Sequence, residues 1–255
     1  MKFLDHPKLY LISKPDIDRE AIKAFLFDNG FPSRFATDHE HAAEQLSATA
    51  SRTCYQSFDS GRSPDEHLKH LVEVGHGSVF THANFSLLVT GISRSLTHEL
   101  IRHHVGTGVS QLSQRFVDDP EELNFVIPPA LLPYWHGGSE GMERFVDGRK
   151  SDVYHYGRWL EFYKSKGLNK KQAAEAARAE LPNCVETRCV FSGNIRAWRN
   201  IWEQRCSEHA DAEIRRFACK SYELIYPYCP TICDDYTRVK LEDGTFSLET
   251  PHRKI

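Results

Sequence analysis

The strongest constraint on the fold is a change of hydrophobic period between residues 80 and 103. Apolar residues first recur at every second position, which is the period of a half-buried strand: Ala83, Phe85, Leu87 and Val89. After Gly91 the spacing becomes four, which is the period of a helix face: Ile92, Leu96 and Leu100. Nothing in the chain resembles a repeated strand–helix unit with a Gly-rich phosphate loop, so we predict an α+β or irregular α/β fold.

Capping and breaking residues mark most of the other elements. The capping box Ser63-Pro64-Asp65-Glu66 begins one helix, and Asn169 can cap another that ends before Pro182. We expect helices over residues 17–27, 39–51, 64–74, 92–103, 151–166, 170–180 and 195–204, and a further one capped by Ser207. We expect strands over residues 8–12, 80–89, 123–127 and 187–192, a terminal hairpin over 239–248, and a surface loop over 134–148. Because the sequence contains no obvious linker, we expect residues 1–255 to form a single domain with a hairpin tail at about 229–255.

Composition narrows the classes of function. The net charge is -3, which gives no global basic field for nucleic acid, so any anion site must be a local cluster of arginines. No apolar run approaches a membrane span, and the first ten residues carry charges where a signal peptide would be apolar. The seven cysteines are odd in number and scattered, without a C-x-x-C pair. We therefore expect reduced thiols, no structural metal and a cytoplasmic location.

A first polar cluster lies in the helix predicted after Gly91. Arg94, His98 and Arg102 recur every fourth residue and would share one helix face, with Glu99 and His103 beside them. Arginine offers the two-pronged donor geometry that phosphate favours, so this face can hold a phosphate and a polar ring together. The alternative is an ordinary solvated helix face.

A second cluster follows directly. Gly106 and Gly108 indicate a bend or a close approach to the backbone. Five polar side chains then surround a single leucine: Ser110, Gln111, Ser113, Gln114 and Arg115. Glutamines and backbone amides suit the edge of a pyrimidine, and arginine suits its phosphate. The alternative is a polar surface loop.

The third cluster belongs to the predicted helix over 195–204. Arg196 and Asn200 share a face opposite Trp198 and Trp202, and Arg205 follows at the junction with the next helix. Such a junction can stabilise an anion near the positive end of that helix. A salt-bridged surface is the alternative, because several acidic residues lie nearby in the sequence.

Taken together and in this order, the three clusters resemble the flavin-dependent thymidylate synthases, the ThyX class. The resemblance runs from about Thr53 to Ala218. Its landmarks are Cys54-Tyr-Gln-Ser57, Gly75-His-Gly-Ser-Val79 with His82, Gly91-Ile-Ser-Arg94, Arg102-His-His104, Ser110-Gln-Leu-Ser-Gln-Arg115, Ala177-Arg178 before Leu181-Pro182, Asn194 with Arg196, and Arg205 with His209-Ala210.

The resemblance implies an antiparallel sheet flanked by helices and a homotetramer whose active sites form between subunits. It implies FAD as cofactor, methylenetetrahydrofolate and NADPH as co-substrates, and methylation of dUMP to dTMP, with no role for nucleic acid or membrane. Residues that match FAD contacts of the family are Ser78, His82, Arg102, His103, His104, Asn194, Arg196 and Asn200. Those that match dUMP contacts are Arg94, Glu99, Gln111, Ser113, Gln114, Arg115, Arg178 and Arg205. By the same resemblance Arg205 and Ser113 are catalytic, and Arg205 would sit at the uracil carbonyl and favour a reactive C5.

The sequence departs from the family signature at one place. The signature is Arg-His-Arg, and here the third residue is His104. The segment Val105–Leu112, between His104 and Ser113, is also one residue longer than in the family. These changes motivate an alternative within the same fold, with UMP as acceptor or transfer of a hydroxymethyl group. Two further alternatives are a non-enzymatic nucleotide- or RNA-binding protein and a methylase that uses Cys184 as nucleophile.

Overall fold

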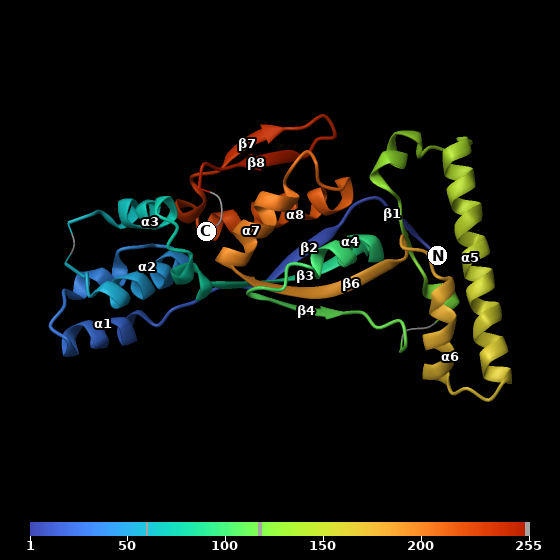
Figure 1. Ribbon diagram of the computed structural model, residues 1–255, viewed down its shortest axis with the longest axis horizontal. Helices are drawn as coiled ribbons and strands as arrows, with labels where there is room; N and C mark the ends of the chain where they lie inside the picture. The colour runs from blue at the N-terminus through green and yellow to red at the C-terminus, as the bar shows by residue number, and fades with distance from the viewer. Residues whose placement is uncertain (60, 117–118, 253–255) are drawn as a thin grey trace.

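The centre of the protein is a four-stranded antiparallel sheet. A computed structural model describes residues 1–59, 61–116 and 119–252. The strands lie in the order β2 (Lys8–Ser13), β3 (Asn84–Ser93), β6 (Glu186–Asn194) and β4 (Thr107–Gln111), and each neighbouring pair is antiparallel (Figure 1). The predicted α+β class, with helices flanking an antiparallel sheet, is confirmed.

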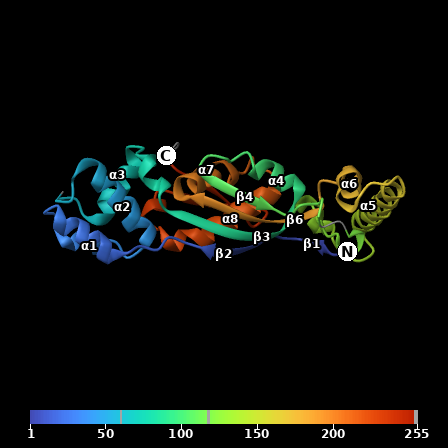
Figure 2. The same ribbon diagram turned by 90° about the horizontal axis from the view of Figure 1, so that it is seen from below.

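Helices cover one face of this sheet and extend the molecule at both ends. Three lie on the covered face: α4 (Arg94–Leu100), α7 (Ile195–Arg205) and α8 (Ala212–Ile225). At one end lie α1 (Arg19–Asp28), α2 (Ala42–Tyr55) and α3 (Pro64–Glu73), and at the other α5 (Glu140–Ser165) and α6 (Lys170–Ala177). Figure 2 shows the resulting elongated shape, with the sheet between the two helical ends. No helix in the described part of the chain has the length and apolarity that a membrane crossing requires.

Shorter elements complete the chain. β1 (Phe3–Leu4) pairs in parallel with β5 (Phe125–Val126), and the expected terminal hairpin is formed by β7 (Thr237–Lys240) and β8 (Phe246–Glu249). Turns of 3-10 helix occupy Ser33–Thr37, Gly77–Thr81, Pro120–Glu122, Pro129–Tyr134, Arg178–Glu180, Tyr226–Tyr228 and Thr231–Cys233. All seven cysteines are free thiols, as expected.

The packing of α7 explains how the site described below is presented. Its inward residues are those that the sequence predicts, and all are fully buried: Ile195, Trp198, Ile201 and Trp202. Trp202 Nε1 donates to Ser221 Oγ of α8 at 3.0 Å, so the indole polar atom is satisfied within the core. Truncating a buried tryptophan of this kind costs about 3–5 kcal/mol. The helix is therefore held firmly, with its opposite face directed away from the core.

The helix predicted over 92–103 is wrong at both ends. β3 continues to Ser93, because Ile92 and Ser93 pair with Thr187 and Glu186 of β6 beyond a β-bulge. Gly91 lies in that bulge with a φ of +69°, where a Cβ atom would lie 2.8 Å from the carbonyl oxygen of His6. Ser93 then caps α4 by accepting from Leu96 N at 3.0 Å, and α4 ends at Leu100. The strand predicted over residues 80–89 begins only at Asn84, because Phe80 lies in a 3-10 turn.

Three further expectations are corrected. The loop expected over 134–148 ends at Ser139, which caps α5 by accepting from Met142 N at 3.2 Å, and the helix then runs through Ser151 without a break. The cap of α8 is Asp211 rather than Ser207, with Glu213 N donating to its carboxylate at 2.9 Å. Residues 107–111, for which the sequence predicts no strand, form β4 because they pair with β6.

Candidate active site

A cavity of about 700 Å³ lies between the outward face of α7 and the loop that follows α4, and we call it the α7 cavity. Its lining includes seven residues that the sequence singles out: Arg102, His103, His104, Asn194, Arg196, Asn200 and Arg205. The other lining residues were not among the predicted site residues: Thr81, Val105, Gly106, Ala197 and Gln204. The sequence carries a signal for Gln204, because it lies one helical turn after Asn200 and should share its helix face. In the structure Gln204 donates to the Asn200 side chain at 3.1 Å. The volume is that of an ordinary cofactor site.

Asn194 joins the two walls of the α7 cavity. Its side-chain oxygen caps α7 by accepting from Ala197 N at 2.9 Å, while its backbone N–H donates to the Gly106 carbonyl at 3.0 Å. Gly106 has a φ of +73°, and a Cβ atom there would lie 2.4 Å from Asn194 Nδ2. The loop with the variant signature is therefore fixed against the start of α7 at a position that only glycine fits.

Arg205, the last residue of α7, is held by two contacts. Its Nη1 donates to Glu99 Oε2 at 2.6 Å, and its Nε donates to His103 Nε2 at 2.9 Å. Burial, and next the positive charge of Arg205, lower the pKa of His103. The guanidinium is thus fixed in the lining of the α7 cavity by a carboxylate and a neutral imidazole.

A second cavity, of about 350 Å³, lies between α4 and α6, and we call it the α4–α6 cavity. Four of its lining residues matter here: Arg94, His98, Gln114 and Arg178. Arg94 Nη2 donates to the Leu112 carbonyl at 2.6 Å, whereas its buried Nε has no partner among the described residues. Burial, and then the charge of Arg178, lower the pKa of Arg94. Two arginines this close in a partly desolvated cavity form a site that an anion would stabilise.

The helix face predicted to carry Arg94, His98 and Arg102 together is therefore divided. α4 ends before Arg102, which lines the α7 cavity, while Arg94 and His98 line the α4–α6 cavity. The two cavities have no lining residue in common. The residues expected to contact one nucleotide are thus distributed over two cavities of the chain.

The remaining candidates lie around these cavities. Gln111 Nε2 donates to Thr97 Oγ1 at 3.0 Å and to Thr187 Oγ1 at 3.3 Å, so its amide bridges α4 and β6. Ser113 Oγ accepts from the backbone of Arg115, whose side chain pairs with Glu175 at 3.3 Å. Ser78 and His82 are exposed; Ser78 lies in the 3-10 turn Gly77–Thr81, which contributes Thr81 to the α7 cavity, and His82 follows that turn.

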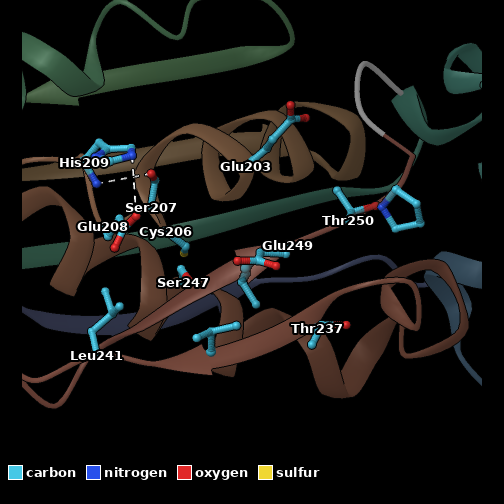
Figure 3. A pocket seen from close by; sticks show the side chains of 13 residues that line it. Glu203, Cys206, Ser207, Glu208, His209, Thr237, Leu241, Ser247, Glu249 and Thr250 are labelled. Carbon is cyan, nitrogen blue, oxygen red and sulfur yellow. Dashed lines mark hydrogen bonds and ion pairs between the residues drawn. The ribbon is translucent and has the colours of Figure 1, made fainter.

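A third cavity, of about 530 Å³, has the wrong charge for a nucleotide. It lies between the end of α7 and the terminal hairpin (Figure 3). Glu203, Glu208 and Glu249 contribute carboxylates, and none of its thirteen lining residues is arginine or lysine. Phosphate would be repelled here, so the two arginine-bearing cavities are the better candidates.

The chain is similar to proteins of one known family over most of its length. The family model described as thymidylate synthase complementing protein matches residues 37–231. The flavin-dependent thymidylate synthase of Corynebacterium efficiens is 38% identical over 233 residues, which cover 87% of this chain and 91% of that protein. The chain belongs to the flavin-dependent thymidylate synthase family. The enzymes of that name from Mycolicibacterium vanbaalenii and Mycobacteroides abscessus are each 40% identical, covering 85% and 77% of this chain and 88% and 80% of their own lengths.

Family membership makes the protein a flavin-dependent enzyme of the thymidylate synthase type, and the α7 cavity fits a flavin nucleotide. Arg102 and Arg196 form no salt bridge with any described carboxylate, so their charges are available to a bound pyrophosphate. Asn194, Asn200 and Gln204 add amide groups that can hydrogen-bond to a ring or a sugar. The roles of the individual residues remain predictions.

Gly106→Ala is expected to lower flavin affinity by about tenfold or more. A non-glycine residue at this φ costs roughly 1–3 kcal/mol, and the added methyl group must displace the Asn194 side chain that it would meet at 2.4 Å. Titration of the apoprotein with FAD, followed by flavin fluorescence, measures the effect. Gly108→Ala is the matched control, because Gly108 has open space at its Cβ position. Equal losses of flavin affinity in Gly106→Ala and Gly108→Ala would contradict a role for the packing of Gly106 against Asn194 in flavin binding.

Proposed function

We propose that this protein methylates C5 of dUMP to give dTMP, with FAD as the flavin, methylenetetrahydrofolate as carbon donor and NADPH as reductant. The observation that carries the proposal is the guanidinium of Arg205, fixed by Glu99 and His103 in the lining of a flavin-sized cavity. A fixed cation suits this reaction, because C5 is a good nucleophile when the uracil ring carries negative charge. A guanidinium at the carbonyl oxygens that share this charge stabilises the anionic ring.

The chain's own residues divide into three tasks. Arg205 stabilises the developing uracil anion, and Gln111 and Ser113 orient the ring and sugar. Arg94, Arg115 and Arg178 neutralise the phosphate. The flavin is held by the predicted set Ser78, His82, Arg102, His103, His104, Asn194, Arg196 and Asn200, and when bound it supplies the hydride chemistry of the reduction.

We also propose that the active site is completed by other subunits, in the homotetramer that the family resemblance implies. Arg205 and the pair Arg94 and Arg178 lie in cavities with no common residue, so a nucleotide that contacts all three needs help from a second copy. The sheet offers a surface for association, since Tyr10 and Leu88 are opposite each other on β2 and β3 and are 51% and 38% exposed. The location that we propose is cytoplasmic.

A second candidate acts on UMP or transfers a hydroxymethyl group. The observation that favours it is the variant loop, of which His104, Val105 and Gly106 line the α7 cavity. Histidine lacks the permanent charge and the two-pronged donor of the arginine that it replaces. A change at this point can therefore alter which group is transferred or which sugar is accepted. Family membership favours either reaction over a non-enzymatic nucleotide- or RNA-binding role.

One experiment separates these reactions. The purified protein is reconstituted with FAD and incubated with dUMP or UMP, methylenetetrahydrofolate and NADPH, and the nucleotides are analysed by mass spectrometry. We expect dTMP from dUMP, dependent on both the folate and the reductant. A hydroxymethyl product, or reaction of UMP in preference to dUMP, would establish the second candidate. If no nucleotide gains a carbon in any combination, both are wrong.

A further inference from the structure

The contact between Arg205 and His103 constrains the chemical state of His103. The donor is Arg205 Nε, which carries a proton at every pH of interest, and it lies 2.9 Å from His103 Nε2. The imidazole nitrogen must therefore present a lone pair. An imidazolium has N–H groups on both nitrogens, so protonation would place two donors and two positive charges against each other.

Other groups around the ring are consistent with a neutral imidazole. Two positive charges face His103, those of Arg205 and Arg102, and the side chain of Asn200 on α7 makes a hydrogen bond with the ring. The carboxylate of Glu99 bonds to Arg205 Nη1. Burial and the two guanidinium groups lower the pKa of His103, while Asn200 acts in the opposite direction.

The two contacts also determine where the Arg205 guanidinium points. Glu99 accepts a hydrogen bond from Nη1 and His103 accepts one from Nε, so two acceptors from different segments fix the plane of the guanidinium. Among the described residues, no protein group accepts from Nη2. If the contact with His103 is lost, Glu99 alone remains, and a single hydrogen bond leaves the guanidinium free to rotate about it.

We propose that His103 is a positioning residue for Arg205: its neutral imidazole holds the guanidinium in place for the uracil carbonyl, and protonation of His103 releases it. This inference rests on the proposed function in assigning Arg205 to the uracil ring. It gives His103 a task toward the nucleotide, separate from the flavin contact that the family resemblance implies. Activity should then fall at acid pH through the loss of an ordered Arg205.

The kinetic test uses two substitutions of His103 and one control. His103→Gln keeps a side-chain acceptor for Arg205 Nε that does not titrate, whereas His103→Ala removes the acceptor. We expect the acid limb of kcat/KM for the nucleotide to disappear in His103→Gln, which should keep activity at alkaline pH within about tenfold of the wild type. His103→Ala should lose about 100-fold there. His155→Gln, a change at an exposed histidine of α5 that lines none of the three cavities, should retain the acid limb.

A spectroscopic test of the same contact does not depend on turnover. Nitrogen NMR of wild-type protein labelled at histidine and arginine should show His103 Nε2 as an unprotonated acceptor, and the Arg205 Nε–H signal should change as His103 titrates. An acid limb that persists in His103→Gln, or a proton on Nε2 at neutral pH, would overturn the proposal. If the wild type makes no product from any nucleotide, the proposed reaction fails, and the NMR result still decides whether His103 positions Arg205.

Discussion

Arg205→Ala is expected to lower kcat/KM for the uridine nucleotide by about 10²–10³-fold. Removing a single fixed donor that faces developing negative charge has an effect of this size, because the group is already ordered when the charge forms. The side chain is only 17% exposed, so water replaces its charge poorly. Steady-state kinetics with dUMP, at saturating folate and reductant, measure the loss, and circular dichroism checks that the variant is folded.

Two control variants accompany Arg205→Ala. One separates the charge of Arg205 from its geometry, and the other tests Cys184 as an alternative nucleophile. Arg205→Lys restores the charge but cannot donate to Glu99 and His103 at once from a planar group, so we expect partial recovery, to about 10–100-fold below the wild type. Cys184→Ala should keep activity within about twofold, because burial raises the pKa of the Cys184 thiol and leaves it protonated and weakly nucleophilic. Full activity in Arg205→Ala together with inactivity in Cys184→Ala would reverse the mechanism.

Local signals in the sequence were sufficient for much of the fold. The capping box of Ser63 and Glu66 forms as expected. Asn169 caps α6 as expected, and Gln172 completes a second capping box there that was not predicted. The inward residues of α7 follow the helical period, and the two strands of the terminal hairpin flank a turn that contains Gly244. Each of these depends on contacts between residues near one another in the chain, which is why spacing and residue type predict them.

Two of the errors come from contacts between distant parts of the chain. Residues 107–111 have no strand pattern of their own and become β4 because β6 offers them a partner. Gly91 ends the sequence pattern of a strand, but β3 continues through it because Ile92 and Ser93 pair with residues of β6. Neither pairing is visible in local spacing.

The same distinction applies to the candidate site. The sequence named Arg205, Glu99 and His103 as candidates, but Arg205 lies 106 residues from Glu99 and 102 from His103. The fold alone brings them into one hydrogen-bonded group. Conversely, Arg94 and Arg102 are close in the sequence and fall in different cavities, because α4 ends between them. Sequence identified the residue types, and tertiary structure determined which of them act together.

Since α7 carries Arg205, the stability of the site depends on what fixes the helix from its other side. Arg199 of α7 is 2% exposed and makes a two-pronged salt bridge with Asp235, with both N–O distances 2.7 Å. It also donates to the Ile232 carbonyl, and its guanidinium lies 4.6 Å from the centre of the Tyr236 ring. The segment leading into the terminal hairpin is thereby attached to α7.

Asp235→Ala is expected to lower the free energy of unfolding by about 3–5 kcal/mol, because it leaves the buried charge of Arg199 without its carboxylate. Urea denaturation should show a lower midpoint with an unchanged slope. Asp234→Ala is the matched control: Asp234 pairs with Lys69 at 2.6 Å, but both side chains are about half exposed, so the loss should be below about 1 kcal/mol. Equal losses would contradict the buried pair.

The loss of unfolding free energy in Asp235→Ala should depend on pH in one direction. The pKa of Asp235 is lowered in the folded protein, since the hydrogen bonds and charge of Arg199 outweigh the opposing effect of burial. A carboxylate with a lowered folded pKa stabilises the protein above its unfolded value of 3.8, and this stabilisation is lost as pH falls through the folded pKa. The difference in the free energy of unfolding between the wild type and Asp235→Ala should therefore be largest at neutral pH and become smaller in strong acid. A gap that grows on acidification would mean that Asp235 acts through something other than its charge on Arg199.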